Sequence, residues 1–386
     1  MNATKRTPQL RFPEFTGEWR EIKFKDIFCR VTSKNKENNQ NILTISAQHG
    51  FVSQDKFFSK IVAAKDVQGY YLLHENDYAY NKSYSKGYPV GAIKRLAQDK
   101  GVVSTLYICF SLKEPGGEAF FDQYFESGKH NREIQKIAQE GARNHGLLNI
   151  SVDDFFDIKL IAPGAAEQQK IAAFLAAVDK RVALLERKVQ QLEAYKRGVM
   201  QQLFSQQLRF TRPDGSRFPV WQEKRLGEIT VNKPSTITAS QLSDSFEGYA
   251  VYGASGIAGY VKSFQHEQPY TAIVKDGAGA GRLLWCKGET SVLSTLTVLL
   301  PRQGIDAGYL HYVLQGIDFS KYITGSTIPH VYYRDFSKAK LKVSVFEEQQ
   351  KIATFLAALD EKITLTRQQL DKTKQFRKGL LQRMFV

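Results

Sequence analysis

Apolar residues in the middle of the chain recur at alternating steps of four and three, the spacing of a helix that buries one narrow face. No proline interrupts residues 167–204, so the pattern predicts a single helix there, about 57 Å long at a rise of about 1.5 Å per residue. The apolar face, called the seam below, consists of Ile171, Leu175, Val178, Val182, Leu185, Val189, Leu192, Val199 and Leu203. Lys196 interrupts the seam.

The same segment returns 181 residues later without a gap, at 348–385, and both copies open with Glu-Gln-Gln-Lys-Ile-Ala. The second copy places Thr366, Thr373 and Arg377 on its seam, whose apolar members are Ile352, Leu356, Leu359, Ile363, Leu370, Leu380 and Met384. A helix with so narrow an apolar face needs a partner, and the repeat supplies one within the chain. We expect the two helices to pair as an antiparallel coiled coil. Two ordinary core helices of duplicated domains are the alternative.

Gly198 and Gly379 occupy equivalent positions in the two copies. A glycine inside a helix costs about 1 kcal/mol relative to alanine, so a repeated glycine indicates a repeated reason. Close approach of a partner backbone is one such reason, and a shared ancestral kink is another.

The segments before the two copies contain short β-branched or aromatic runs, such as 102–110 and 292–300, separated by glycine-rich turns. Each begins alike: Arg11-Phe12-Pro13 precedes Trp19, and Arg217-Phe218-Pro219 precedes Trp221. The pattern predicts an α+β multidomain chain in which two mixed α/β blocks are separated by two long helices. The expected boundaries are 1–166 for the first block, 167–204 for the first helix, 205–347 for the second block with a linker at 205–217, and 348–386 for the second helix.

The chain of 386 residues has 54 Lys and Arg against 39 Asp and Glu, a formal net charge of +15, which favours a polyanionic partner such as nucleic acid. Cys29, Cys109 and Cys286 lie far apart, so neither a disulfide framework nor a zinc cluster is expected. No apolar run reaches the length of about 18–20 residues that a membrane span needs, and the amino terminus lacks the apolar core of a secretion signal. We expect a cytoplasmic protein.

The sequence contains one motif typical of an enzyme, a glycine-rich loop, and its context does not fit. The glycines of 277–281 follow an apolar run, as in a cofactor-binding methyltransferase, but Lys275 stands where an acidic residue is wanted and a strand-like run follows in place of a helix. There is no phosphate-binding G-x-x-x-x-G-K-S/T loop, and the seven histidines show no metal-binding spacing. The sequence therefore predicts a protein that is not an enzyme and has no cofactor or metal.

Two blocks of unlike sequence, each followed by a similar helix that opens with Glu-Gln-Gln-Lys-Ile-Ala, resemble the specificity subunit of type I restriction-modification enzymes. Pro163 before the first helix also fits that family, whereas the second copy has Val345-Phe346 there. The resemblance implies that 1–166 and 205–347 are target recognition domains, each reading one half of a split, asymmetric double-stranded DNA site. It also implies that the helices hold these domains apart, and that two methyltransferase subunits and restriction subunits bind the chain.

The reading loops vary in this family, so the chemistry of the side chains indicates the candidate DNA-binding residues: amides and cations read bases, and aromatic rings stack on them. A solvated basic loop accounts for the same residues. In the first block the candidates are Tyr80, Asn81, Lys82, Ser83, Tyr84 and Lys86, and also Arg143, Asn144 and His145. In the second they are Lys275, Arg282, Ser326, Thr327, His330, Tyr332, Tyr333 and Arg334.

Two other functions stay open at this point. One is a single-chain DNA methyltransferase that uses the glycine loop at 277–281, which binding of S-adenosylmethionine would reveal. The other is a basic coiled-coil scaffold without sequence preference, which would select no motif from a pool of random duplexes.

Overall fold

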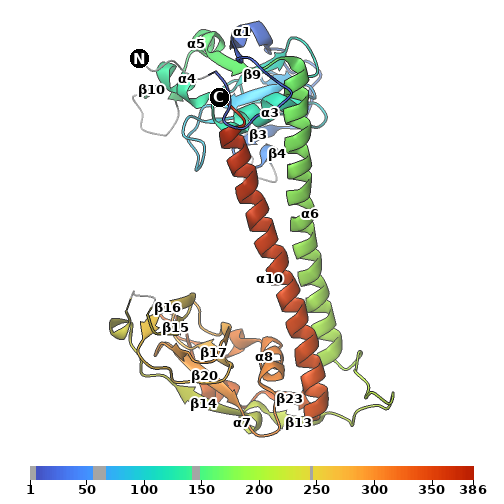
Figure 1. Cartoon of the computed structure of the whole chain (residues 1–386), viewed down its shortest axis with the longest axis vertical. Helices are drawn as coiled ribbons and strands as arrows, with labels where there is room; N and C mark the ends of the chain where they lie inside the picture. The colour runs from blue at the N-terminus through green and yellow to red at the C-terminus, as the bar shows by residue number, and fades with distance from the viewer. Residues whose placement is uncertain (1–5, 55–66, 141–147, 244–246) are drawn as a thin grey trace. The chain divides into compact units, whose positions relative to one another are not determined.

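The computed structural model describes residues 6–54, 67–140, 148–243 and 247–386 (Figure 1). The chain divides into two compact units. Unit 1 comprises residues 1–185 and 369–386, and unit 2 comprises residues 186–368. Each unit therefore contains one block together with a part of each long helix, and each is described by itself.

Unit 1 is built from short strands and helices that precede the first long helix. Its elements are β1 (Arg20–Lys23), α1 (Phe24–Ile27), β2 (Phe28–Arg30), β3 (Leu43–Ser46), β4 (Gly50–Ser53), β5 (Tyr71–Leu73), β6 (Tyr78–Asn81), β7 (Ala92–Arg95), β8 (Gly101–Val103), β9 (Ile108–Leu112), α3 (Glu118–Ser127), α4 (Asn131–Ile137), β10 (Gln139–Glu140), β11 (Leu148–Asn149), α5 (Val152–Asp157) and β12 (Lys159–Ala162).

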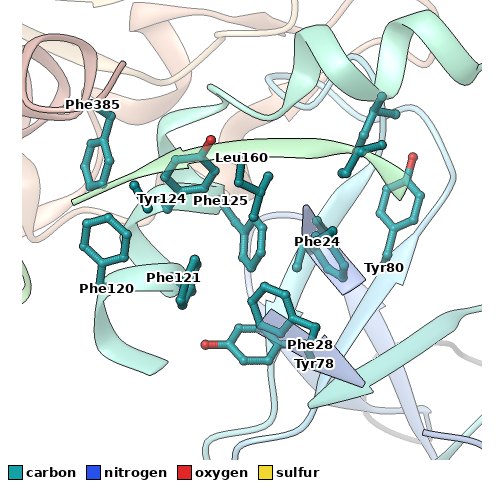
Figure 2. Close-up of a cluster of buried hydrophobic side chains, with 14 of the residues drawn as sticks. Phe24, Phe28, Tyr78, Tyr80, Phe120, Phe121, Tyr124, Phe125, Leu160 and Phe385 are labelled. Carbon is teal, nitrogen blue, oxygen red and sulfur yellow. The ribbon is translucent and has the colours of Figure 1, made fainter. Parts of the chain in front are cut away.

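The central sheet of unit 1 has the strand order β2-β9-β6-β7 with all neighbours antiparallel. Successive side chains of a strand point to opposite faces, so Tyr78 and Tyr80 of β6 enter one core while Ala79 enters another. The first core is a cluster of aromatic rings from the sheet and from α1, α3 and α5 (Figure 2). Phe385, near the carboxyl end of the chain, packs on Phe120 and belongs to the same core.

Unit 2 repeats this architecture with an unlike sequence. Its elements are β13 (Gln222–Arg225), α7 (Leu226–Ile229), β14 (Thr230–Pro234), η1 (Ala239–Gln241), β15 (Tyr249–Gly253), β16 (Gly256–Val261), β17 (Tyr270–Val274), β18 (Leu283–Cys286), β19 (Ser291–Val292), β20 (Leu296–Pro301), α8 (Ala307–Gln315), η2 (Phe319–Tyr322), β21 (Ile323–Thr324), β22 (His330–Val331), α9 (Tyr333–Phe336) and β23 (Lys340–Val343).

The central sheet of unit 2 has the order β14-β20-β17-β18, again antiparallel throughout. Strand β17 is buried on both faces: Ala272 and Val274 enter one core, and Ile273 enters the core that contains α8. Chain order therefore matches β2 with β14, β6 with β17, β7 with β18 and β9 with β20. The predicted mixed α/β class of both blocks is confirmed.

A two-stranded ribbon closes each block against the start of its long helix. Strand β1 pairs with β12, with Arg20 opposite Ala162, and β13 pairs with β23, with Gln222 opposite Val343. Each ribbon joins the first strand of a block to its last strand, just before the long helix begins.

The long helices are α6 (Ala165–Phe204) and α10 (Phe346–Arg383), and each contributes residues to both units (Figure 1). Burial of the seam residues confirms the predicted seam. Ile171, Leu175, Val199 and Leu203 are buried, and so are their counterparts on α10. None of the helices within the described ranges is long and apolar enough to cross a membrane.

The cation that interrupts each seam pairs with a carboxylate of the opposite helix. In unit 2 Lys196 Nζ lies 2.6 and 2.8 Å from the Asp360 carboxylate oxygens, which also accept a 2.8 Å bond from the Tyr312 hydroxyl. In unit 1 Arg377 pairs with Asp179, which also accepts a 3.0 Å bond from the Gln123 amide. Asp179 and Asp360 are repeat equivalents, so each unit contains one copy of the same polar contact.

Within unit 2 the helix segments run antiparallel, because a second pair joins Glu193 to Arg367 beside the pair of Lys196 with Asp360. The paired glycines lie in open space: in the described part of the chain, a Cβ added at Gly198 or Gly379 would meet nothing within 4 Å. Close approach within the chain therefore does not explain them.

Candidate nucleic-acid interface

In each unit the loop between two central strands contacts the second strand of a neighbouring hairpin, at topologically equivalent places. In unit 2 the β17–β18 loop contacts the β21–β22 hairpin: the Val331 N–H donates to the Lys275 carbonyl (2.8 Å), and the Gly277 N–H donates to the Pro329 carbonyl (2.9 Å). In unit 1 the Leu148 N–H of β11 donates to the Lys82 carbonyl, which begins the β6–β7 loop (3.1 Å). The fold thus brings together candidates that are far apart in sequence.

The glycines of 277–281 form a tight turn between two antiparallel strands. Gly277 and Gly281 have φ values of +91° and +86°, which favour glycine. A Cβ at Gly281 would also lie 2.9 Å from the Phe319 side chain. Strand β18 follows the turn, in place of the helix that cofactor binding in the methyltransferase alternative would require.

A row of stacked side chains borders this turn. His330 Nδ1 lies 2.8 Å from Asp276 Oδ1, and its ring stacks on Tyr332 with a centroid separation of 6.0 Å and an interplanar angle of 17°. The Arg334 guanidinium lies 5.0 Å from the centroid of the same Tyr332 ring. Rings and cations exposed together in this way suit contact with bases and phosphates.

The other candidates of unit 2 divide into exposed and anchored side chains. Arg282, Ser326 and Thr327 are exposed, and Arg282 also donates to the Ala254 carbonyl of the β15–β16 turn (3.1 Å). Tyr333 is half-buried. Its hydroxyl lies 2.9 Å from Thr230 Oγ1 and its ring packs edge-on against Phe336, so it fixes α9 to the core.

The prediction for Tyr80 is wrong. Its side chain is 0% exposed, its ring stacks on Phe155, and its hydroxyl donates to the Val90 carbonyl. Burial raises the pKa of this phenol well above its usual value. Tyr80 belongs to the core of unit 1 because it shares a strand face with Tyr78 (Figure 2).

The rest of the β6–β7 loop has the predicted surface character. Tyr84 and Lys86 are exposed, Lys82 and Ser83 are half-buried, and the Asn81 amide donates to the Ile45 carbonyl and accepts from the Ser83 N–H. The loop borders a cavity of about 370 Å³ whose other wall includes β3. Arg143, Asn144 and His145 lie outside the described residues, between β10 and β11.

The family whose sequence pattern matches this chain is described as the type I restriction modification DNA specificity domain, and it matches residues 16–194 and 220–375. The two matched segments take up most of the chain and fall one on each block with its following helix. The chain belongs to this family.

Other specificity proteins resemble the chain in sequence or in fold. The type I restriction enzyme EcoprrI specificity subunit of Escherichia coli is 27% identical over 143 residues, a match that spans 36% of this chain and only 36% of that protein. The crystal structure of the type I restriction-modification S subunit from M. genitalium shares the fold with a TM-score of 0.62 at 17% identity, over 98% of this chain and 99% of that one.

A further solved structure, described as the basis of complex assembly and conformational transition of the type I R-M system, has a TM-score of 0.55 at 16% identity. It covers 95% of this chain and 97% of its own. Among the described residues of this specificity-domain protein, no group of three His, Cys, Asp or Glu side chains could hold a metal ion.

One arrangement that the sequence analysis missed is a buried cluster at the start of each long helix, called the clasp here. In unit 1 Arg11 donates to both Glu167 carboxylate oxygens (2.7 and 2.8 Å), and the Trp19 indole N–H lies 3.3 Å from the same carboxylate. The bond to Glu167 raises the pKa of Arg11. The clasp ties the first residues of the block to the first turn of α6.

The clasp of unit 2 has the same geometry. Arg209 donates to both oxygens of Glu348 (3.1 and 2.7 Å), and the Trp221 indole N–H donates to that carboxylate at 2.8 Å. Arg209 therefore corresponds to Arg11, and the sequence comparison that matched Arg11 with Arg217 is corrected. The sequence contains a pattern that indicates this correspondence, because Gln-Leu-Arg-Phe at 9–12 recurs at 207–210.

Four large apolar side chains on the long helices are exposed at repeat-equivalent positions. Unit 1 exposes Leu184 (57%) and Phe376 (56%), and unit 2 exposes Leu365 (57%) and Tyr195 (55%). Each aromatic residue stands three positions before one of the open glycines, Gly198 or Gly379. At these repeat-equivalent positions each unit thus presents one leucine and one aromatic ring to solvent.

Proposed function

We propose that this chain is the DNA sequence-specificity subunit of a type I restriction-modification complex, and that its two blocks each read one half of a split, asymmetric double-stranded site. The observation that carries the proposal is that both units have the same sheet order and place a hairpin strand beside the equivalent loop (β6–β7 or β17–β18), while the residues of these two loops differ. Equivalent frames present the loops alike, while unlike loops read unlike bases. The chain itself is not an enzyme, and its partner subunits carry out the catalytic steps.

The charges and side chains of the loops support duplex DNA as the ligand. Lys86 lies exposed in the β6–β7 loop, while Arg282 and Arg334 lie exposed beside the β17–β18 turn. Cations of this kind neutralise phosphates and position a duplex, while amides, rings and guanidinium groups read base edges. The net charge of +15 agrees with this ligand.

The proposal includes the long helices as an antiparallel coiled coil that spaces the two recognition domains at 1–166 and 205–347. The buried seams and the repeated contacts of Lys196 with Asp360 and of Arg377 with Asp179 support it. A polar residue within a seam fixes the register of paired helices. Since its proposed ligand is DNA, the complex is proposed to act in the cytoplasm.

Selection of duplexes from a random pool, by this chain together with its methyltransferase partner, tests the function. Two fixed blocks of bases separated by a spacer of constant length are expected. A pool that stays random would favour the scaffold alternative. Saturable binding of S-adenosylmethionine to the chain alone would favour the methyltransferase alternative.

The repeated apolar pairs support two docking surfaces for methyltransferase subunits, with restriction subunits joining the complex so formed. Asp179 faces Arg377, so Phe376 lies about 6 Å along the axis from Leu184, at about 1.5 Å per residue. An exposed ring beside an open glycine offers both contact area and room for a partner backbone. The same surface in each unit fits two copies of one partner.

We predict that a saturated complex contains one copy of this chain and two methyltransferases, and that Tyr195→Ser with Leu365→Ser leaves only one. Leu184→Ser with Phe376→Ser should do the same at the other surface, because losing an aromatic contact costs about 2 kcal/mol or more in binding. Native mass spectrometry reads the stoichiometry directly. Val220→Ser is the control, since Val220 is 82% exposed but has no equivalent in the repeat. Two bound methyltransferases in either double variant would contradict the assignment.

A further inference from the structure

His330 is held in one orientation by the residues around it. Its backbone pairs with Thr324 in the β21–β22 hairpin and also forms a bridge to Asp276. Gly325 makes room for the ring, because a Cβ there would lie 3.3 Å from His330 Cδ2 and 2.4 Å from the Ile328 carbonyl oxygen. Stacking on Tyr332 and the 2.8 Å contact with Asp276 fix the remaining freedom of the ring.

The contact with Asp276 also decides which ring nitrogen carries the proton. An ionised carboxylate only accepts hydrogen bonds, so Nδ1 must donate to Asp276 Oδ1. In the neutral ring the other nitrogen, Nε2, then carries a lone pair and accepts. Nε2 has no hydrogen-bond partner among the residues that the structure describes, and the side chain is 34% exposed.

Asp276 is an unusual residue for a surface that contacts DNA, because a carboxylate repels phosphates. Here its second oxygen, Oδ2, lies 4.0 Å from Lys275 Nζ, so the group stands between a lysine and a histidine. A negative charge in this place is explained if its task is to orient His330. A phosphate oxygen only accepts hydrogen bonds, so it cannot pair with the lone pair of Nε2 in the neutral ring.

We propose that His330 is a specificity-determining residue whose Nε2 accepts a hydrogen bond from an exocyclic amino group in the major groove, and that Asp276 is its positioning residue. The ligand group is the N6 amino group of adenine or the N4 amino group of cytosine, because guanine and thymine present acceptors there. The assignment rests on the proposed function, and it adds the chemical group on the DNA that His330 recognises.

The first experiment repeats the selection of duplexes with His330→Ala in the complete complex with the methyltransferase. One base pair of one half-site is expected to lose its preference by about tenfold, and the other half-site should not change. In wild type, a duplex lacking that single amino group, with purine for adenine or 2-pyrimidinone for cytosine, should bind about tenfold more weakly. The His330→Ala complex should bind this duplex and the unmodified duplex with the same affinity, since the contact is already absent.

The second experiment tests the positioning residue with Asp276→Asn. An asparagine side chain can accept from Nδ1 or donate to it, so both tautomers become available and Nε2 accepts or donates. Discrimination between amino and keto bases at that one pair should narrow, while affinity for the original site falls only modestly. Glu247→Gln is the matched control, because it removes one exposed carboxylate of the same unit that lies outside the β17–β18 loop and the β21–β22 hairpin. It should leave the selected sequence unchanged.

The outcomes separate this inference from the proposed function. If wild type selects a split site but His330→Ala weakens all sequences equally, His330 contacts phosphate and the inference fails while the function stands. Undiminished binding of wild type to the duplex that lacks the amino group, or an unchanged selected site in His330→Ala, would also overturn it. If wild type selects no site, the proposed function itself fails.

Discussion

Glu348→Ala is expected to destabilise unit 2 by about 3–5 kcal/mol, because it leaves the guanidinium of Arg209 and the indole N–H of Trp221 without their shared acceptor in a buried place. Glu348 is 0% exposed and lies in the first turn of α10. Losing the clasp should loosen β13, which follows Trp221, from β23. Hydrogen exchange of the amides in these two strands of the full chain measures the change in opening free energy.

The neighbouring residue provides a matched control for the clasp. Glu347→Ala removes the same side chain one position away, but that carboxylate is exposed and lies 3.7 Å from Arg212, so an effect below about 1 kcal/mol is expected. Glu167→Ala should reproduce the loss in unit 1, at β1 and β12, and leave unit 2 unchanged. Equal exchange in the Glu347→Ala and Glu348→Ala proteins would refute the importance of the clasp.

The clasp also shows how far the sequence alone could be interpreted. The repeat of Glu-Gln-Gln-Lys-Ile-Ala predicted two helices and their seams, since periodic burial is a local property of the chain. The reason for a buried Glu348 is not local: its partners Arg209 and Trp221 precede it by more than 120 residues. The short repeat that contains Arg209 was hidden by the more conspicuous Arg-Phe-Pro at 217–219.

The candidate DNA-binding residues show the same difference between local patterns and contacts that are distant in sequence. The prediction for Tyr80 rested on the polar residues that follow it in sequence. Tyr80 lies within strand β6, however, where even-numbered side chains enter one core and Ala79 enters another. The choice of Lys275 and His330 did place two residues on one surface, although only the pairing of β22 with the β17–β18 loop brings them together. Their link through Asp276 could not be predicted, because nothing in the sequence marks which residues face each other across two hairpins.

Adding one heptad to both long helices, after Val189 and after Leu370, is expected to lengthen the selected spacer by about three base pairs. Seven residues keep the seam in phase and extend the pair by about 10 Å at roughly 1.5 Å per residue, and DNA rises about 3.4 Å per base pair. The pairs of Lys196 with Asp360 and of Asp179 with Arg377 stay intact, because both insertions fall between them. Selection from random duplexes measures the spacer.

The same insertion should weaken binding, and the reason is rotation. Three base pairs turn the duplex by about a third of a helical turn, since one turn takes about 10–10.5 base pairs. One added heptad in the proposed coiled coil, whose supercoil pitch is about 150 Å, turns the domains far less. The bases selected in each half should stay the same because the loops that read them are untouched. A heptad added to α6 alone is the control: it leaves seven residues without a partner on α10 and should abolish selection. Altered half-site bases with the original spacer would show that the helices do not set the separation.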